Sequence, residues 1–137
     1  ANRGERVTCI FVNNAVYGMT GGQMAPTTLP GQVTTTSPGG RKPLRDGNPL
    51  DLSAMLALAA GSVFIERTTV ANPKGVNRTK KAIRKAFQAQ LDDKGFSLVE
   101  VLSPCPTNWK MSPVDSITWV EETMSKIFPI QVIKDVA

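Results

Sequence analysis

The sequence predicts an α/β domain in which a mostly parallel β-sheet is flanked by helices. Short β-branched and apolar segments alternate along the chain with longer segments of helical periodicity. The predicted strands are nearly continuous in apolar residues, as expected when helices cover both faces of a parallel sheet. Asn-Pro, Ser-Pro and Gly signals separate the segments and mark where the helices begin and end.

The composition is that of a folded domain and restricts its chemistry. The chain has 137 residues, of which 41% are hydrophobic and 20% charged, which is typical of one domain with a real core. It contains no apolar run long enough to span a membrane, so we expect no membrane partner. The two cysteines are too few for a disulfide framework and indicate a reducing compartment, the cytoplasm. Histidine is absent, so any catalysis is expected to depend on a cofactor.

Four segments are predicted to be strands. Arg6–Val12 (RVTCIFV) is apolar on both faces and predicts a buried central strand, in which Cys9 is an ordinary core residue. Ser62–Thr69 and Phe96–Leu102 are predicted to be further strands, and Gln131–Val136 is expected to pair at an edge of the sheet.

Two helices are predicted in the middle of the chain. Asn48 and Pro49 have the properties of an N-cap and a first-turn proline, and predict a helix that continues to Ala59 and stops at Gly61. A long helix is expected from about Val76 to Asp93. Its predicted apolar stripe contains Val76, Ile83, Phe87 and Leu91, with Ala82 and Ala86 beside it.

A third helix is predicted near the end of the chain. Ser112-Pro113-Val114-Asp115 is a capping box with proline in the first turn, and Pro129 ends the helix. The apolar residues expected on its buried face are Val114, Ile117, Val120, Met124 and Ile127.

The segment Gly18–Pro49 is too rich in glycine and proline for any regular element. It follows the predicted central strand, and ligands in open α/β sheets bind beyond the carboxyl ends of strands. Asn13 and Asn14 offer amide oxygens to a hard cation, glycines let N–H groups approach a phosphate, and Thr20 adds a hydroxyl. Composition alone leaves a plain turn as the alternative.

The string NNAVYGMTGGQMAPTT, residues 13–28, closely resembles the thiamine-diphosphate loop in the β-subunits of 2-oxoacid:ferredoxin oxidoreductases, where variants of DNxxYGxTGGQxSPTT recur. The resemblance continues to the SPCPTNW loop and the helix after it, and so covers essentially the whole chain. Subunits for branched-chain 2-oxoacids such as 2-oxoisovalerate (2-ketoisovalerate) are the most similar. The resemblance implies a thiamine-diphosphate-binding fold and a contribution to the CoA-dependent oxidative decarboxylation of a 2-oxoacid, with electrons passing to ferredoxin.

Site residues follow from the same resemblance. It implies that Mg²⁺ is bound by a side-chain oxygen of Asn14 and by the backbone carbonyl of Val16. It also implies a cofactor-binding loop, in which the first three residues line the diphosphate and thiazolium and the last two let the loop fold over them: Gly18, Met19, Thr20, Gly21 and Gly22. For Tyr17, contact with the cofactor and packing beneath the loop both remain open.

Cys105 is the second residue of interest. A lone cysteine after a buried strand is by default a small core residue, but a proline-flanked loop favours a positioned thiolate. The resemblance implies that Cys105 is the last of four ligands to a 4Fe–4S cluster, which requires cysteine thiolates. The neighbouring Trp109 could shield that cluster, although an ordinary loop anchor is the preferred interpretation.

The chain also departs from the family pattern. Family members carry an upstream Gly-Asp-Gly motif, whose Asp is another Mg²⁺ ligand, and an upstream Cys-rich segment. Neither occurs in these 137 residues. We therefore expect residues 1–137 to be the C-terminal part of a thiamine-diphosphate-binding domain that provides one side of the site. The expected partners of the complete enzyme are an α-subunit and other subunits, ferredoxin, coenzyme A and the 2-oxoacid.

The net charge of +5 raises a rival hypothesis, a basic nucleic-acid-binding α/β domain without catalysis. Scattered basic residues and an aromatic content of 6% argue against it, so no nucleic-acid partner is expected. The one basic cluster, Lys74–Lys85, is interpreted as a solvated helix face, with Lys80, Lys81, Arg84 and Lys85 pointing outward. Docking of an acidic ferredoxin or of CoA phosphates is its alternative.

Overall fold

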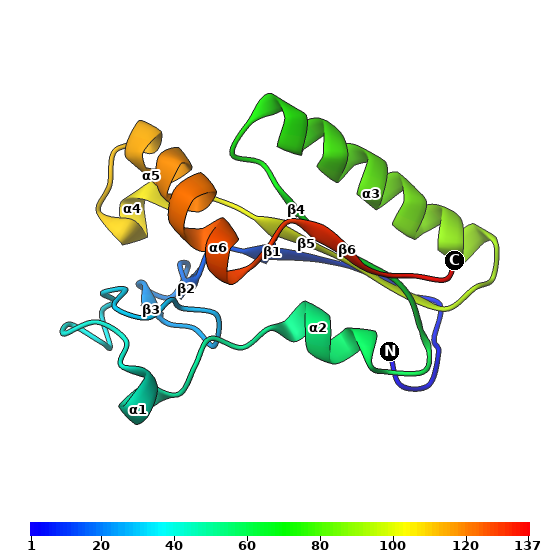
Figure 1. Ribbon diagram of the computed structural model, residues 1–137, viewed down its shortest axis with the longest axis horizontal. Helices are drawn as coiled ribbons and strands as arrows, with labels where there is room; N and C mark the ends of the chain where they lie inside the picture. Colours follow the sequence, from blue (N-terminus) through cyan, green and yellow to red (C-terminus); the bar gives the residue numbers. More distant parts are fainter.

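The computed structural model describes all 137 residues and contains a four-stranded sheet with the strand order β1-β5-β4-β6 (Figure 1). The strands β1 (Thr8–Asn13), β5 (Phe96–Leu102) and β4 (Ser62–Thr69) run parallel, whereas β6 (Gln131–Asp135) is antiparallel to β4. The predicted α/β class and the mostly parallel sheet are therefore confirmed. As predicted, β6 forms an edge of the sheet.

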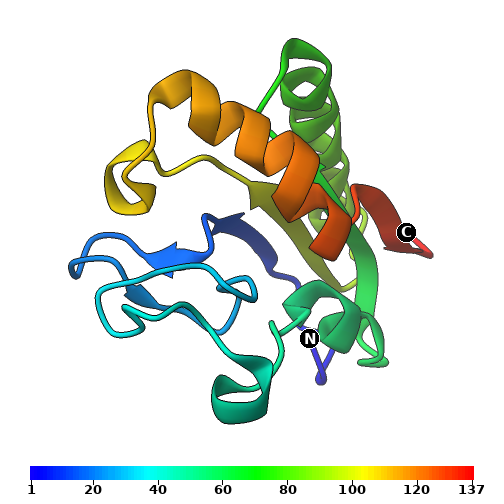
Figure 2. The same cartoon turned by 60° about the vertical axis from the view of Figure 1, so that its left-hand side comes forward.

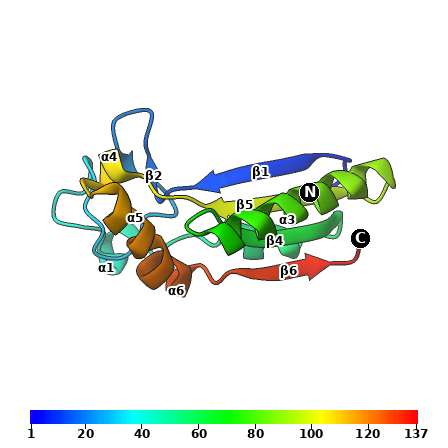
Figure 3. The same ribbon diagram turned by 90° about the horizontal axis from the view of Figure 1, so that it is seen from above.

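The parallel register brings three chain segments to the same end of the sheet, the end at which β1, β5 and β4 have their carboxyl termini. Asn13 at the end of β1 pairs with Leu102, and Leu102 pairs with Thr69 at the end of β4. The segments that follow these strands therefore begin side by side. Figure 3 shows these loops and short helices gathered at the end of the sheet toward which β1 points.

β1 does not lie at the centre of the sheet, contrary to the prediction for Arg6–Val12. It forms one edge, and Ile10 and Val12 are 39% and 58% exposed, because no strand of this chain pairs with its outer side. The central positions belong to β5 and β4. Cys9 is partly buried and packs against Ile65, Phe96 and Leu98, in agreement with its predicted core role.

Helices cover both faces of the sheet. The long helix α3 (Pro73–Leu91) packs on β4 and β5, and the short helix α2 (Leu52–Ala57) lies on the opposite face against β4 and β6 (Figure 1). None of the helices is both long and apolar enough to cross a membrane.

α3 begins earlier than expected and buries only part of the predicted stripe. The side chain of Asn72 caps it by accepting a 2.7 Å hydrogen bond from the amide of Gly75. Phe87 and Leu91, predicted to lie on the buried stripe, are 53% and 80% exposed. Ala82 and Ala86 are buried as predicted, and Ile83 packs partly buried against the same core. The other buried residues of the helix are also small, which lets it approach the sheet closely: Gly75, Thr79 and Ala89. The outward orientation of Lys80, Lys81, Arg84 and Lys85 is confirmed.

α2 also begins later than the Asn48-Pro49 signal predicts. Its N-cap is Asp51, whose side chain accepts a 2.9 Å hydrogen bond from the amide of Ala54. The Asn48 carbonyl accepts a hydrogen bond from Arg41, and the amide of Leu50 donates to Pro26. These bonds hold residues 48–50 against the preceding loop, so the helix cannot start there.

The third predicted helix is present as α5 (Pro113–Trp119), a π-helical turn η1 (Val120–Met124) and α6 (Ser125–Ile127). The predicted N-cap is confirmed, because the Ser112 hydroxyl accepts a hydrogen bond from the amide of Asp115; the Asp115 carboxylate accepts a bond from this hydroxyl and not from the Ser112 amide, so the reciprocal bond of a capping box is not formed. Val114, Ile117 and Ile127 are 72%, 38% and 44% exposed, contrary to prediction. Val120 and Met124 are buried, as predicted, and Ser116 and Phe128 lie on the same buried face, four residues before and after them.

The long segment Gly18–Pro49 contains short regular elements that its composition did not predict. β3 (Gln23–Met24) pairs antiparallel with β2 (Val16–Tyr17), and α1 (Pro43–Asp46) forms a single turn. The guanidinium of Arg41 organises this segment, since it is 5% exposed and its NH groups donate to backbone carbonyls rather than to an acid. The acceptors are the carbonyls of Ala25, Pro26, Thr28, Asp46, Gly47 and Asn48.

Candidate functional site

The candidate site lies where the segments after β1 and after β5 meet, at the carboxyl edge of the sheet (Figure 2). The first segment carries Asn13, Asn14 and residues Gly18–Gly22, which we call the glycine loop. The second segment carries Cys105 and α4 (Pro106–Trp109). The two segments are distant in the chain but come from neighbouring parallel strands. This is the position at which open α/β sheets bind ligands.

Hydrogen bonds hold the backbone on both sides of Asn14. The side-chain oxygen of Asn13 accepts a 3.1 Å bond from the amide of Ala15, which has a left-handed φ of 57°. The Asn14 carbonyl accepts a 3.0 Å bond from the indole of Trp109, and the Ala15 carbonyl accepts a 2.6 Å bond from the hydroxyl of Thr28. The direction of the backbone from residue 13 to residue 16 is therefore set before any ligand binds.

The structure brings the two predicted metal ligands together. Asn14 and Val16 line the same hollow of about 380 Å³, between the end of β1 and the segment around Pro26. An amide oxygen and a backbone carbonyl fit a hard cation such as Mg²⁺. Nowhere in the chain do three or more His, Cys, Asp or Glu side chains form a cluster that could hold a metal ion. The residues present thus fit part of a Mg²⁺ coordination shell and leave the rest to other ligands.

The glycine loop projects from the site. Gly21 and Gly22 have φ values of 111° and 77°, which side chains other than glycine rarely adopt. The Met19 side chain is fully exposed, and the hydroxyl of Thr20 donates to the side chain of Gln23. Tyr17 is 52% exposed, so it is not packed beneath the loop.

Asn108, which no sequence pattern singled out, connects this loop to Cys105. Its Nδ2 donates a 3.2 Å hydrogen bond to the Cys105 Sγ. A Cβ added at Gly18 would lie 3.1 Å from Asn108 Nδ2, and one added at Gly22 would lie 2.9 Å from Asn108 Oδ1. Two glycines of the loop are therefore required for the close approach of the Asn108 amide. The only sequence signal for a role of Asn108 was that it lies within the SPCPTNW string.

Cys105 is partly buried and occupies the N-cap position of α4. Cys9, the other free cysteine, lies within β1 beside Leu98 and not at this end of the sheet. One thiol fits one position of a 4Fe–4S cluster, which needs four ligands. The residues of this chain therefore do not complete such a site.

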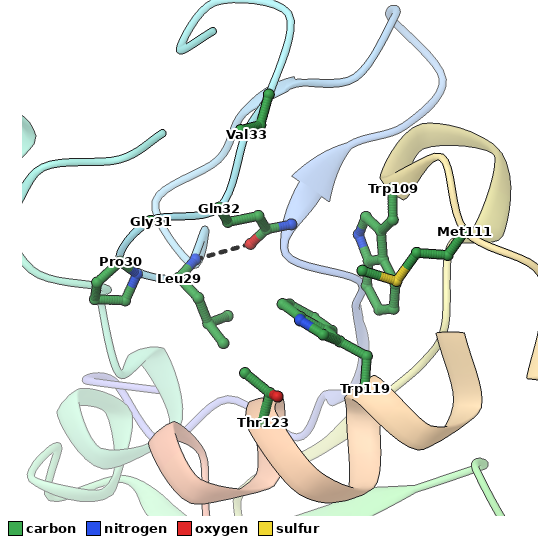
Figure 4. A pocket seen from close by; sticks show the side chains of 9 residues that line it. All are labelled: Leu29, Pro30, Gly31, Gln32, Val33, Trp109, Met111, Trp119 and Thr123. Atoms are coloured by element: carbon green, nitrogen blue, oxygen red, sulfur yellow. Dashed lines mark hydrogen bonds between the residues drawn. The ribbon is translucent and has the colours of Figure 1, made fainter. Parts of the chain in front are cut away.

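Trp109 is a structural anchor, in agreement with the preferred interpretation. Besides its bond to Asn14, its ring packs at 55° against Trp119 with the ring centroids 4.4 Å apart. Figure 4 shows both rings and Met111 on one side of a hollow of about 420 Å³, with the segment from Leu29 to Val33 opposite.

A buried polar network lies beneath the site and was not predicted from the sequence. The carboxylate of Glu100 in β5 is hydrogen-bonded to Asn13, Ser53 and Arg67, which come from β1, α2 and β4. The only sequence signal was the presence of charged residues inside apolar strand segments. We call these four residues the Glu100 network.

Comparison with protein families assigns this fold. Residues 1–101 match the family described as thiamine pyrophosphate enzyme, C-terminal TPP binding domain. The chain belongs to this family. The predicted thiamine-diphosphate-binding fold is thereby confirmed, and the hollow lined by Asn14 and Val16 lies within the matched residues.

Individual proteins confirm the resemblance stated above. The chain is 49% identical, over 98% of its length, to the ketoisovalerate oxidoreductase subunit VorA of Methanothermobacter marburgensis, and covers 28% of that protein. It is 40% identical over 88% of its length to the 2-oxoglutarate synthase subunit KorB of Archaeoglobus fulgidus, and covers 40% of it.

A solved structure shares the fold. The 2-oxoglutarate:ferredoxin oxidoreductase from Magnetococcus marinus, determined with 2-oxoglutarate, coenzyme A and succinyl-CoA bound, superposes with a TM-score of 0.69 at 19% identity. The match covers all of this chain and half of that one.

Proposed function

We propose that this chain is the C-terminal part of the thiamine-diphosphate-binding domain of a 2-oxoacid:ferredoxin oxidoreductase β-subunit, and that it supplies one side of the cofactor site. The observation that carries the proposal is the placement of Asn14 and Val16. Both residues line one hollow at the carboxyl edge of a parallel sheet, in a chain that belongs to the TPP-binding family.

In this proposal the Asn14 side-chain oxygen and the Val16 carbonyl would be two of the ligands of the Mg²⁺ that accompanies the diphosphate. Gly18, Met19 and Thr20 line the cofactor, and Gly21 and Gly22 let the loop fold over it. Bound thiamine diphosphate supplies the electron sink for decarboxylation of a 2-oxoacid. The contribution of this chain is to bind and orient the cofactor. Because the chain contains no histidine, it supplies no imidazole for proton transfer.

Cys105 would be one of four thiolate ligands to a 4Fe–4S cluster in the complete subunit. The position of its thiol beside the glycine loop supports this role, because Sγ lies 3.7 Å from where a Cβ at Gly18 would be. A redox centre next to the cofactor is what passing electrons to ferredoxin requires.

The complete enzyme would convert a 2-oxoacid and coenzyme A to an acyl-CoA, with an α-subunit and other subunits as partners. Two ketoisovalerate oxidoreductase subunits, 49% and 50% identical to this chain, favour 2-oxoisovalerate as the substrate. Two free cysteines agree with a reducing cytoplasm.

Calorimetry on the complete subunit tests the proposal. Asn14→Leu should abolish Mg²⁺-dependent binding of thiamine diphosphate, because it removes one metal ligand and fills the space with an apolar side chain. Asn77→Leu is the matched control, since Asn77 is exposed on α3, and it should bind normally. Unchanged binding by the Asn14 variant contradicts the proposal. The 137-residue chain alone should not bind the cofactor tightly, because it holds only part of the coordination shell.

A further inference from the structure

The Glu100 network places an ionic group directly beneath the candidate site. Glu100 and Arg67 are 1% and 0% exposed, and Arg67 Nε donates to a Glu100 oxygen at 2.7 Å. Arg67 also pairs with Asp51, and its guanidinium lies 5.3 Å from the ring of Phe128. The buried negative charge of Glu100 is therefore balanced by the positive charge of Arg67, which Asp51 and Phe128 hold in place.

The charge of Glu100 determines which way the Asn13 amide points. Asn13 Nδ2 donates a 2.7 Å hydrogen bond to the second oxygen of Glu100. A carboxylate can only accept hydrogen bonds, so the amino group of Asn13 must face it. The amide oxygen of Asn13 consequently faces the turn, where it accepts the N–H of Ala15 at 3.1 Å.

That second hydrogen bond acts on the residue between the two candidate metal ligands. Ala15 has a left-handed φ of 57°, a conformation that costs an alanine free energy unless its surroundings hold it. Its backbone decides the relative direction of the Asn14 side chain and the Val16 carbonyl.

We propose that Asn13 is a positioning residue: its amide, oriented by Glu100, holds the turn at Ala15 so that Asn14 and Val16 face one metal ion. The inference rests on the proposed function for what those two residues bind. The side chain at position 13 supplies a hydrogen-bond donor to the carboxylate at position 100, and only one of these two positions carries a carboxylate.

A charge exchange tests this matching. Asn13→Asp alone would set two carboxylates against each other across 2.7 Å of buried space. Adding Glu100→Gln should repair the contact, because the new amide at position 100 can donate to the carboxylate introduced at position 13 and still accept from Arg67. The double variant keeps the net charge of the chain and reverses the direction of one hydrogen bond.

Amide hydrogen exchange in the 137-residue chain is the first measurement, with the Val99 amide in the middle of the sheet as an internal reference for global opening. Asn13→Asp should accelerate exchange at Ala15 about fivefold more than at Val99, since repulsion from Glu100 turns the new carboxylate away from the turn and the hydrogen bond to the Ala15 amide, worth roughly 1 kcal/mol, is lost. The double variant should return the ratio of the Ala15 exchange rate to the Val99 exchange rate to about its wild-type value. An unchanged ratio in Asn13→Asp, or no recovery in the double variant, overturns the proposal.

Asn13→Ala covers the case in which Asn13→Asp does not fold. It removes both hydrogen bonds without adding charge, so the Ala15 ratio should rise and Glu100→Gln should not restore it. If Glu100→Gln restores the ratio in Asn13→Ala as well, charge matching is wrong.

The Mg²⁺ dependence of thiamine-diphosphate binding by the complete subunit is the second measurement. Asn13→Asp should raise the Mg²⁺ concentration required for half-saturation about tenfold, and the double variant should restore it. Normal Mg²⁺ dependence in Asn13→Asp, with loss of binding in Asn14→Leu, overturns the positioning role and leaves the proposed function intact. If Asn14→Leu also binds normally, the proposed function fails, and hydrogen exchange alone decides whether Asn13 holds the turn.

Discussion

The indole Nε1 of Trp109 donates a 3.0 Å hydrogen bond to the main-chain carbonyl of Asn14, 95 positions earlier in the chain. This bond joins the loop after β5 to the turn after β1. It restrains the backbone of one candidate metal ligand from the loop that carries Cys105. The two candidate cofactor-binding segments are thus a single structural unit.

Replacing Trp109 by Phe should therefore loosen this unit. The variant keeps most of the apolar contact with Trp119 but leaves the Asn14 carbonyl without its donor, which should cost about 1 kcal/mol of unfolding free energy. Urea denaturation followed by circular dichroism measures the loss. Trp119→Phe is the control, because no hydrogen bond from its indole is present, and it should hold the Asn14 turn as in the wild type. Equal stability of Trp109→Phe and wild type would count against the anchor role.

Gly22→Ala should be destabilising by about 1–3 kcal/mol, for two reasons. Its φ of 77° is unfavourable for alanine, and the added methyl would lie 2.9 Å from Asn108 Oδ1. Combining it with Asn108→Ala should recover the steric part and leave the conformational part. Gly39→Ala is the neutral control, since its backbone is not left-handed and no atom lies within 4 Å of the added Cβ. Thermal denaturation of these variants and the wild type checks these expectations, and a neutral Gly22→Ala would refute them.

Arg67→Ala should lower the unfolding free energy by about 3–5 kcal/mol, because Glu100 would remain buried without a cationic partner. Arg6→Ala serves as the comparison. The Arg6 and Asp93 side chains are 63% and 59% exposed in their ion pair, so the loss of Arg6 should cost at most about 1 kcal/mol. Denaturant titrations give both values, and similar costs for the two variants would contradict the difference in burial.

The pH dependence of stability should include a contribution from Asp46. A side-chain hydrogen bond from Arg45 and a backbone hydrogen bond from Lys42 lower the pKa of this carboxyl from 3.8 to about 2. Because the folded pKa lies below the unfolded one, the contribution is present above about pH 4 and is lost as the pH falls toward 2. Carbon NMR of the carboxyl gives its pKa directly.

Asp46→Asn is the matching control for this titration. It should be less stable than the wild type near neutral pH, and the difference should vanish near about pH 2. A stability difference that does not change with pH would show that the charge of Asp46 is not responsible.

Local features of the chain were enough to predict the α/β class and the approximate positions of the four strands of the main sheet. Nearly continuous apolar strands and the capping signal at Ser112 could be recognised without tertiary contacts, because each depends only on neighbouring residues. The string from Asn13 to Thr28 identified the family for the same reason.

Tertiary contacts settle which elements meet. Hydrogen bonds from Arg41 move the start of α2 to Leu52, and close packing on the sheet selects the alanine face of α3 over the face with Phe87. Only the parallel register of β1, β5 and β4 brings Asn13 to Glu100 and Asn14 to Trp109. Such contacts depend on strand order and on burial, and neither is encoded in any short stretch of the sequence.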